Sequence, residues 1–423
     1  MKYVDVINKY RKPTVPDIHR TVSCWAPFQS IHINKRGELK VCPFTMRKEV
    51  EHKNSTPYEK PPIKATWEPG KSLRDLWQND EAIEEIREKA LEGDLHDWCR
   101  YCQEQCHDDK PPSSLDFDWV GGPRDINHAV PKEIEFELSN TCNYQCKFCS
   151  PYHSSQHMEA MGRNLPEELK VQIGQHLKKE IPDGLPWEEY RDFMNEVNPT
   201  YLSRFESIYD NPEVADAFIE ELRDIIHEVH RVNFTGGEPF AQRIVHKILK
   251  MIDEENPKNL KIQITTNGSI LNGYARKLAQ RPNTKFVISL DSIDPDIYPD
   301  LRRNGDLNNV LKHIDELIAY DVAQVGCSFV ISKDNVWTLP RILSFCNSKG
   351  LEFSYHILSP MGGTNTLEDI APWAVEAESK EYLQKLRDYL KNAVIETDFH
   401  HEKDPAIVEK NMRMYNQYIE RLK

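Results

Sequence analysis

Three cysteines lie close together in one segment of the chain and could hold a metal centre. The segment LSNTCNYQCKFCSP places Cys142, Cys146 and Cys149 with the spacing C-x3-C-x2-C. Thiolates are the preferred ligands of iron in iron-sulfur clusters, and three of them leave one iron of a 4Fe-4S cluster open to a cofactor or substrate. A structural zinc ion would instead need a fourth ligand to complete its tetrahedron. The residues alone therefore favour an open 4Fe-4S cluster and leave structural zinc as the alternative.

The cysteine spacing resembles a known family. The motif C-x3-C-x2-C, with the aromatic Phe148 directly before the last cysteine, resembles the radical S-adenosylmethionine (SAM) superfamily. The segment FTGGEP at 234–239 resembles the glycine-rich SAM-binding motif of that family. This resemblance implies that the backbone at Gly236 and Gly237 and the side chain of Glu238 receive the amino group of SAM. Glycine permits the close backbone approach that such a contact needs.

Three further motifs extend the resemblance: TTNGS at 265–269, SLDS at 289–292 and LRRNG at 301–305. They imply that Ser289 and Asp291 contact the ribose of SAM and that Arg302 contacts its carboxylate. A lone serine or arginine in such a loop ordinarily only meets solvent or caps the backbone. Arg303 could replace Arg302, and Asn335 in SKDN is a further candidate for the pocket. The cofactor-binding residues that the resemblance implies are Phe148, Gly236, Gly237, Glu238, Thr266, Asn267, Ser289, Asp291 and Arg302.

The order of apolar segments in the second part of the chain predicts an α/β fold. Strand patterns alternate with helical patterns at 241–255 and 307–321, which predicts parallel strands joined by right-handed crossovers. Six such units are fewer than a closed eight-unit barrel needs, so we expect a partial (β/α)6 barrel of the TIM type. The six strand segments are EIEFELS (133–139), VNFTG (232–236), KIQITTN (261–267), KFVISLD (285–291), VGCSFVIS (325–332) and LEFSYHIL (351–358).

The two main motifs follow consecutive predicted strands. The loops after the carboxyl ends of parallel strands meet at one mouth of such a fold, so the cysteine loop and the GGEP loop should face each other. This placement argues against the alternative in which the cysteines bind structural zinc and GGEP is only a tight turn.

Composition divides the chain into parts. The run 108–125 is rich in Pro, Gly and Ser and is typical of a linker. The interval of about 155–230 is too long for one crossover and has helical patterns, so we expect a helical insertion that caps the fold or, alternatively, gates the substrate. The expected parts are an auxiliary domain at 1–107, a linker at 108–130, the partial barrel at 131–365 and a C-terminal helical segment at 366–423.

A second group of cysteines lies in the N-terminal α+β part. Alternating segments at 30–34 and 38–42 predict a hairpin, and an apolar stripe predicts a helix at about 72–92. The segment 72–102 resembles the connecting segment of the SPASM and twitch auxiliary-cluster domains of radical SAM enzymes, although those domains usually follow the barrel. The resemblance implies a second 4Fe-4S cluster, and zinc is the alternative that four cysteines would equally suit. The expected ligands are Cys24, Cys42, Cys99 and Cys102, with Cys106 as a spare or alternative.

Composition also bounds the class of protein. The formal net charge of −14 over 423 residues argues against a large surface that binds a nucleic-acid backbone electrostatically. The N-terminus lacks the apolar core of a signal peptide, and no stretch approaches the about 20 apolar residues that span a bilayer. We therefore expect a cytoplasmic protein without a membrane partner. In that reducing compartment ten cysteines do not indicate disulfides, and the isolated Cys327 and Cys346 should be buried core thiols.

The resemblance implies a radical reaction. An electron from a flavodoxin- or ferredoxin-type donor would cleave SAM into methionine and a 5'-deoxyadenosyl radical, which abstracts a hydrogen atom from the substrate. An auxiliary cluster could accept the electron left on the substrate, which favours oxidation, crosslinking or another modification of a peptide or protein side chain. The alternatives are radical oxidation or rearrangement of a small metabolite and, in another class, a redox-inactive metal-binding adaptor. The sequence does not identify the substrate, because fold and cofactor motifs do not specify it.

Overall fold

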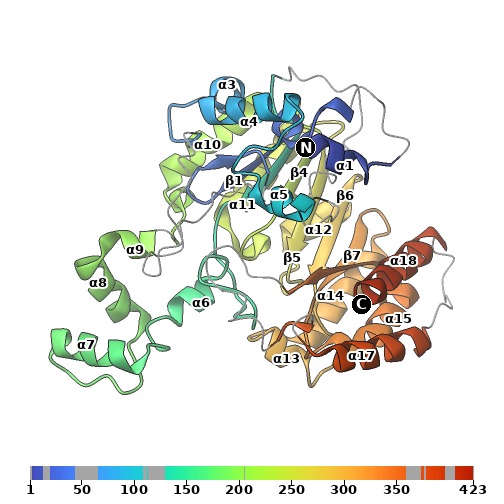
Figure 1. Cartoon of the computed structure of the whole chain (residues 1–423). Coiled ribbons are helices and arrows are strands. Elements are labelled where there is room, and N and C mark those ends of the chain that lie inside the picture. Colours follow the sequence, from blue (N-terminus) through green and yellow to red (C-terminus); the bar gives the residue numbers. More distant parts are fainter. Residues whose placement is uncertain are drawn as a thin grey trace. The chain divides into compact units, whose positions relative to one another are not determined.

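The computed structural model describes residues 2–12, 20–42, 65–107, 112, 129–203, 205–358, 373–375, 378–395 and 405–422. The contacts within the chain divide it into two units, coloured by sequence in Figure 1. The first unit comprises Met1–Ser139, Glu206–Phe234 and Arg243–Lys261, and the second comprises Asn140–Phe205, Thr235–Gln242 and Ile262–Lys423. Most of the linker expected at 108–130 lies outside the described residues.

The first unit contains four strands in the order β2-β1-β3-β4. These are β1 (Ser30–Asn34), β2 (Leu39–Lys40), β3 (Glu133–Glu137) and β4 (Arg231–Phe234). Strands β1 and β2 form the expected antiparallel hairpin, and β3 and β4 are parallel as predicted. However, β1 also pairs in parallel with β3 along its whole length. The hairpin therefore extends the parallel sheet, which the expectation of a separate N-terminal module did not include.

The two faces of β3 differ in chemistry. The phenyl ring of Phe136 lies 6.3 Å from that of Phe218 on helix α10 (Pro212–Ile225), with the rings edge to face. Successive side chains of a strand point to opposite faces. Since Phe136 packs against α10, Glu135 and Glu137 point to the other face of the sheet. This second face is polar in the first unit.

A group of buried or mostly buried titratable side chains lies on β1 and β3 and in the turn after β1. The Nε2 atom of His32 lies 3.1 Å from Oε2 of Glu137, and the side chain of His32 is only 5% exposed. Lys35, in the turn after β1, is 1% exposed. Burial lowers the pKa of Lys35 to about 7, although the charge of Glu137 opposes this shift. Burying the charged ammonium form of Lys35 therefore costs free energy.

The helices of the first unit differ in one respect from the prediction. A single helix was expected at about 72–92, but the structure has α3 (Leu73–Asn79) and α4 (Glu81–Leu91). Asp80 separates them because its backbone is extended and its carboxylate accepts hydrogen bonds from the amides of Ala82 and Ile83. An aspartate that caps the following helix ends the preceding one. The other helices of the unit are α1 (Tyr3–Asn8), α2 (Ala26–Gln29), α5 (Arg100–His107), α10 and α11 (Arg243–Glu255).

The second unit contains the remaining four strands in the order β5-β6-β7-β8, all parallel. They are β5 (Lys261–Thr266), β6 (Thr284–Ser289), β7 (Gln324–Ile331) and β8 (Glu352–Ile357). The intervening helices are α12 (Gly273–Ala279), α13 (Tyr298–Leu301), α14 (Leu307–Ala319) and α15 (Leu339–Lys349). All six predicted barrel strands are thereby confirmed, and the chain has the predicted α/β fold with a mostly parallel sheet.

The C-terminal residues form helices, as expected, in the part that the structure describes. These are α17 (Lys380–Asn392) and α18 (Pro405–Arg421), which lie near α15 in Figure 1. Helix α18 packs against α15, α17 and β8. The buried side chain of Asn411 on α18 accepts a hydrogen bond from the amide of Phe353 (2.7 Å) and donates one to the carbonyl of Leu351 (2.9 Å). Helix α18 thus completes the hydrogen bonding of β8. Cys327 and Cys346 are fully buried, as predicted.

The predicted helical insertion is present. Its helices are α6 (Ser155–Glu159), α7 (Glu167–Leu177), α8 (Trp187–Val197) and α9 (Pro199–Ser203), followed by α10 of the first unit. The segment has an apolar cluster of its own, centred on Leu165, Ile173, Leu185, Tyr190 and Leu202. The insertion therefore folds around its own small core.

Among the described helices, none is both long enough and apolar enough to cross a bilayer.

We predict that Lys35→Met raises stability at pH 7 by at least about 1 kcal/mol, because it removes a buried amine that prefers to be neutral. The pKa of Lys35 is lower in the folded chain than in the unfolded chain. The unfolded chain therefore binds more protons above about pH 7, and the stability of the wild type should rise with pH up to about pH 10. The advantage of the variant should shrink over the same range.

Urea unfolding of the reconstituted protein at pH 7 and pH 9.5 measures this difference. Arg36→Met is the matched control, since Arg36 is a neighbouring cation that is partly exposed. A Lys35→Met protein that is less stable than the wild type at pH 7 would contradict the prediction.

Candidate metal centre and cofactor pocket

The cysteine loop that follows β3 is pinned by backbone hydrogen bonds. The amides of Gln145 and Lys147 donate to the carbonyl oxygens of Arg303 (3.0 Å) and Leu301 (2.9 Å), so the loop lies against the LRRNG segment. The amide of Cys149 donates to the carbonyl of Cys146 (3.0 Å). Two motifs that are far apart in the sequence are therefore adjacent in the second unit.

The three thiols of this loop are neighbours in a site that excludes most solvent. Burial raises the pKa of Cys142 to about 12, and the charge of Cys146 adds to this effect. Burial also raises the pKa of Cys149 to about 12, with further contributions from Cys146 and Cys142. A bound cation would reverse these shifts, because ligating thiols must be deprotonated. Within the described residues, no three His, Cys, Asp or Glu side chains are already arranged around a single metal-ion position.

Two polar groups reach the sulfur atoms directly. Nη1 of Arg302 lies 3.5 Å from Sγ of Cys146, and the backbone amide of Tyr144 lies 3.4 Å from Sγ of Cys142. Donors of this kind are common around thiolates that ligate iron, where they stabilise the negative charge on sulfur. The donor set therefore fits an iron-sulfur cluster.

Arg302 forms an ion pair with a second predicted site residue. Its Nε lies 2.7 Å from Oδ2 of Asp291, and the two side chains are 11% and 6% exposed. The other carboxylate oxygen of Asp291 accepts a hydrogen bond from the amide of Val330 (2.7 Å), and the side chain of Asn335 donates to the carbonyl of Asp291 (2.9 Å). Asp291 also has a positive φ of 58°. The structure thus brings Arg302, Asp291 and Asn335 together, while Ser289 lies half-buried at the end of β6.

The GGEP loop lies directly against the cysteine loop. Gly237 has a φ of 51°, and a Cβ atom at this position would clash with the carbonyl oxygen of Thr141. That oxygen accepts a hydrogen bond from the amide of Glu238 at 2.8 Å. Gly236 also has a positive φ, of 70°. Glycine is therefore needed at position 237 for a close approach between two loops of the protein, while the predicted approach of this backbone to SAM stays a prediction.

The carboxylate of Glu238 connects the GGEP loop to the TTNGS loop. The side chain is fully buried, and its oxygen atoms accept hydrogen bonds from the amide of Phe240 (3.1 Å), the hydroxyl of Thr266 (2.7 Å) and the amide of Asn267 (2.7 Å). Burial raises the pKa of Glu238 to about 7 despite these donors. The contact of Glu238 with the SAM amino group stays a prediction, to which the structure adds a role in aligning the loops.

Asn267 connects this hydrogen-bond network to the cysteine loop. Its side-chain nitrogen donates to the side-chain oxygen of Asn143 (2.9 Å) and lies 4.0 Å from Sγ of Cys142. Asn143 in turn donates to the hydroxyl of Ser269 (2.9 Å). The aromatic ring of Phe148 lies 6.0 Å from that of Trp373. The cysteine loop and the LRRNG, SLDS, GGEP and TTNGS segments therefore form one connected set.

Sequence reasoning does not single out two residues that support the cysteine loop. The hydroxyl of Ser155 accepts from the amide of Cys142 at 3.2 Å and lies 3.1 Å from its carbonyl oxygen. Nε2 of His157 lies 2.8 Å from the carbonyl oxygen of Cys146, and this nitrogen must carry the hydrogen because the oxygen can only accept. Both residues lie just after the third cysteine, but an isolated serine or histidine has no pattern that would reveal the contact.

The N-terminal cysteines converge in the first unit. Cys24 is buried with Val6, Ile7 and Ala26 in an apolar cluster that Cys42, Cys99 and Cys102 also join. Burial raises the pKa of Cys24, and the charges of Cys42, Cys102 and Cys99 raise it further. The four predicted thiols are therefore electrostatic neighbours. The pKa of Cys106 is raised to about 11 by burial alone, without a contribution from another cysteine.

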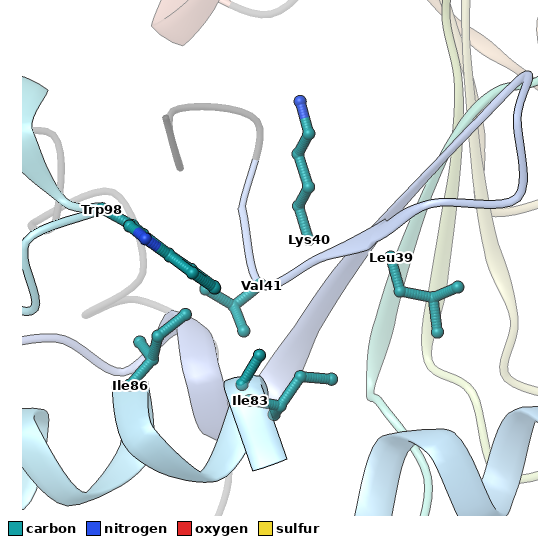
Figure 2. A pocket seen from close by; sticks show the side chains of 7 residues that line it. Leu39, Lys40, Val41, Ile83, Ile86 and Trp98 are labelled. Atoms are coloured by element: carbon teal, nitrogen blue, oxygen red, sulfur yellow. The ribbon is translucent and has the colours of Figure 1, made fainter. Parts of the chain in front are cut away.

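A small apolar pocket adjoins the segments that carry two of these cysteines. It is lined by Leu39, Lys40, Val41, Ala82, Ile83, Ile86 and Trp98. Figure 2 shows Trp98, Val41 and Ile86 pointing toward one another, while the amine of Lys40 points away. Val41 directly precedes Cys42, and Trp98 directly precedes Cys99.

A comparison with protein families agrees with these motifs. The family model described as the radical SAM superfamily matches residues 136–346, which include the cysteine loop, the GGEP loop and Arg302. The chain belongs to the radical SAM superfamily. The match leaves Cys24, Cys42, Cys99 and Cys102 outside it.

Individual relatives of this radical SAM protein match only in part. A GTP 3',8-cyclase from Alkaliphilus oremlandii is 32% identical over 151 residues, which cover 34% of this chain and 47% of that protein. A probable GTP 3',8-cyclase from Methanocaldococcus jannaschii is 30% identical over 122 residues, or 29% of this chain and 40% of that protein. The crystal structure of Streptococcus suis SuiB matches at 15% identity with a TM-score of 0.35, covering 68% of this chain and 52% of that one. This chain spans about half the length of the curated relatives it matches.

We predict that Glu238→Gln weakens SAM binding at least about tenfold, or about 1.4 kcal/mol, while iron content stays near that of the wild type. The carboxylate accepts from three donors. A glutamine must turn an NH2 group toward at least one of them, so the TTNGS loop loses a hydrogen bond and its alignment. Anaerobic equilibrium dialysis with SAM, together with iron analysis, measures both quantities.

Glu316→Gln is the control, because Glu316 pairs with Arg276 on the surface of the same unit. Equal SAM affinity in the wild type and Glu238→Gln would count decisively against the predicted role of Glu238.

Proposed function

We propose that this radical SAM protein holds a 4Fe-4S cluster through Cys142, Cys146 and Cys149 and uses it to cleave SAM reductively. The cofactors together supply methionine and a 5'-deoxyadenosyl radical, which abstracts a hydrogen atom from the substrate. The observation that carries the proposal is the convergence of three neighbouring, half-buried thiols with the GGEP and TTNGS loops. A redox-inactive adaptor would have no use for this cofactor pocket.

The protein's own residues would bind and orient SAM. We assign the amino group of SAM to the GGEP loop, its ribose to Ser289 and Asp291, and its carboxylate to Arg302. Phe148, Thr266 and Asn267 would complete the pocket. Burial of the thiols and of Glu238 supports this assignment, because a site that excludes water protects a reactive radical from side reactions.

A second 4Fe-4S cluster is proposed for the N-terminal cysteines. The charges of Cys42 and Cys102 raise the pKa of both Cys24 and Cys99, so the four thiols are close enough to supply a complete ligand set, and the resemblance to twitch and SPASM domains favours iron over zinc. We assign Cys24, Cys42, Cys99 and Cys102 as the ligands. Cys106 is left out because its pKa shift comes from burial alone.

With an auxiliary cluster as electron acceptor, the proposed reaction is oxidation or crosslinking of a peptide or protein side chain, with electrons supplied by a flavodoxin- or ferredoxin-type donor. A second candidate is radical chemistry on a small metabolite. It is favoured by the relatives named GTP 3',8-cyclase, which match part of the chain. Anaerobic incubation with SAM, reductant and either peptides or GTP, followed by mass analysis, separates the two. A mass change in the peptide or in GTP identifies the class.

We predict that replacing Cys146 by alanine abolishes the formation of 5'-deoxyadenosine. Each of the three thiols supplies a ligand that nothing else in the loop can replace, so the same result is expected for Cys142→Ala and Cys149→Ala. The measurement is 5'-deoxyadenosine from reconstituted protein with SAM and dithionite. Cys346→Ala serves as control, since Cys346 is a core thiol outside the site. Wild-type yields from Cys146→Ala would overturn the proposed function.

We predict that the triple variant Cys142→Ala, Cys146→Ala, Cys149→Ala still binds about four irons per chain when reconstituted without oxygen. Its Mössbauer spectrum should be that of a cubane cluster. Adding Cys99→Ala should remove this iron, whereas adding Cys106→Ala should not. Stoichiometric zinc with no iron after reconstitution would make the N-terminal group a structural zinc site and remove the auxiliary electron acceptor from the mechanism.

A further inference from the structure

The cysteine loop has several cationic neighbours, of which Arg302 contacts a sulfur atom. Its Nη1 lies 3.5 Å from Sγ of Cys146. Lys147 is instead paired with Asp300 (2.6 Å) and Asp334 (3.2 Å), and the half-exposed Arg303 lies 3.5 Å from Asp300. The charge of Arg302 acts on Cys146 by lowering its pKa against the larger effect of burial. Arg302 is therefore the guanidinium that meets the cluster ligand.

Arg302 is held in this position from its other side. Its ion pair with Asp291 is buried, and Asp291 is itself fixed by the amide of Val330. The pKa of Arg302 is raised, because the charges of Asp291 and Cys146 outweigh the effect of desolvation. The guanidinium thus stays charged and cannot swing away without leaving a buried carboxylate unpaired, which would be strongly destabilising.

A fixed positive charge beside a cluster ligand changes the energy of electron transfer. When a low-potential one-electron donor reduces a 4Fe-4S cluster from the 2+ to the 1+ state, the cluster and its thiolates gain one negative charge. A charged N–H group next to a ligand sulfur stabilises this added charge more than it stabilises the oxidised state. Hydrogen bonds to the sulfurs are among the known determinants of cluster potential.

We propose that Arg302 is a positioning residue that raises the reduction potential of the catalytic cluster through its contact with Cys146, and that Asp291 limits this effect. The inference rests on the proposed function only in that Cys142, Cys146 and Cys149 must hold the cluster. In this proposal, Arg302 affects the reduction potential of the cluster before SAM binds. Arg302 therefore raises the reduction potential of the cluster, and Asp291 lowers it.

The test is an anaerobic redox titration of the reconstituted full-length chain without SAM, followed by electron paramagnetic resonance. The signal of the triple variant Cys142→Ala, Cys146→Ala, Cys149→Ala is subtracted to remove the N-terminal centre. Arg302→Gln should lower the equilibrium constant for reduction at least about tenfold, which is ~59 mV for a one-electron couple. Arg302→Lys, which retains the charge, should recover part of this loss.

Asp291→Asn should shift the potential upward, since it removes a negative charge near Cys146. A loosened loop would instead shift both variants in the same direction. Arg303→Gln is the matched control and should change the equilibrium constant less than about twofold, a difference of ~18 mV. Should Arg302→Gln bind no iron, the double variant Asp291→Asn, Arg302→Gln, which leaves no unpaired buried charge, is expected to have a potential below that of the wild type, because the charge of Arg302 outweighs that of Asp291 at Cys146.

A potential that does not move in iron-replete Arg302→Gln, or shifts of the same sign in Arg302→Gln and Asp291→Asn, would overturn this inference alone. A double variant that titrates at or above the wild type would also overturn it. A wild type that shows these shifts among its variants and yet forms no 5'-deoxyadenosine would overturn the proposed function and leave the inference standing.

Discussion

The loop that carries Cys142, Cys146 and Cys149 meets the GGEP loop with no side chain between them, and the geometry of the site depends on that contact. Only glycine fits at position 237, because a Cβ atom would collide with the carbonyl oxygen of Thr141. The same oxygen accepts the amide of Glu238 at 2.8 Å. With its backbone fixed there, Glu238 turns its carboxylate inward to Thr266 and Asn267. A single close approach therefore sets the relative positions of three loops.

Most of the buried charge at this site is balanced by a specific partner. Glu238 is surrounded by three donors, and Asp291 is paired with Arg302. For the thiols, the compensation from Arg302 and the amide of Tyr144 is smaller than the effect of burial, which raises the pKa of Cys142 and Cys149 to about 12. The protein thus holds three groups in a place where they are poor thiolates until a cation is present. Metal binding would supply that charge, which couples the order of this loop to cluster insertion.

The sequence was sufficient for features that depend on local pattern, and insufficient for those that depend on tertiary contacts. Alternating apolar residues and cysteine spacing predicted the six barrel strands and the clustering of both thiol groups. The break at Asp80 was not predicted, because a capping aspartate within an apolar stripe is also compatible with a continuous helix. The parallel pairing of β1 with β3 was also missed, since the partner strands lie about a hundred residues apart. The pair of Arg302 with Asp291 joins two motifs that the resemblance had assigned to separate parts of SAM.

Strand β3 contains the point at which the match to the family model begins. The family match begins at residue 136, within this strand, and covers the loop that bears the three cysteines. The opposite, polar face of the strand carries Glu135 and Glu137, and the neighbouring strand β1 adds His32 next to Glu137. Burial lowers the pKa of Lys35 to about 7, which opposes stability and is typical of functional positions. The cysteine loop thus lies within the residues that the family model matches, as does Glu137, whereas His32 and Lys35 lie outside them.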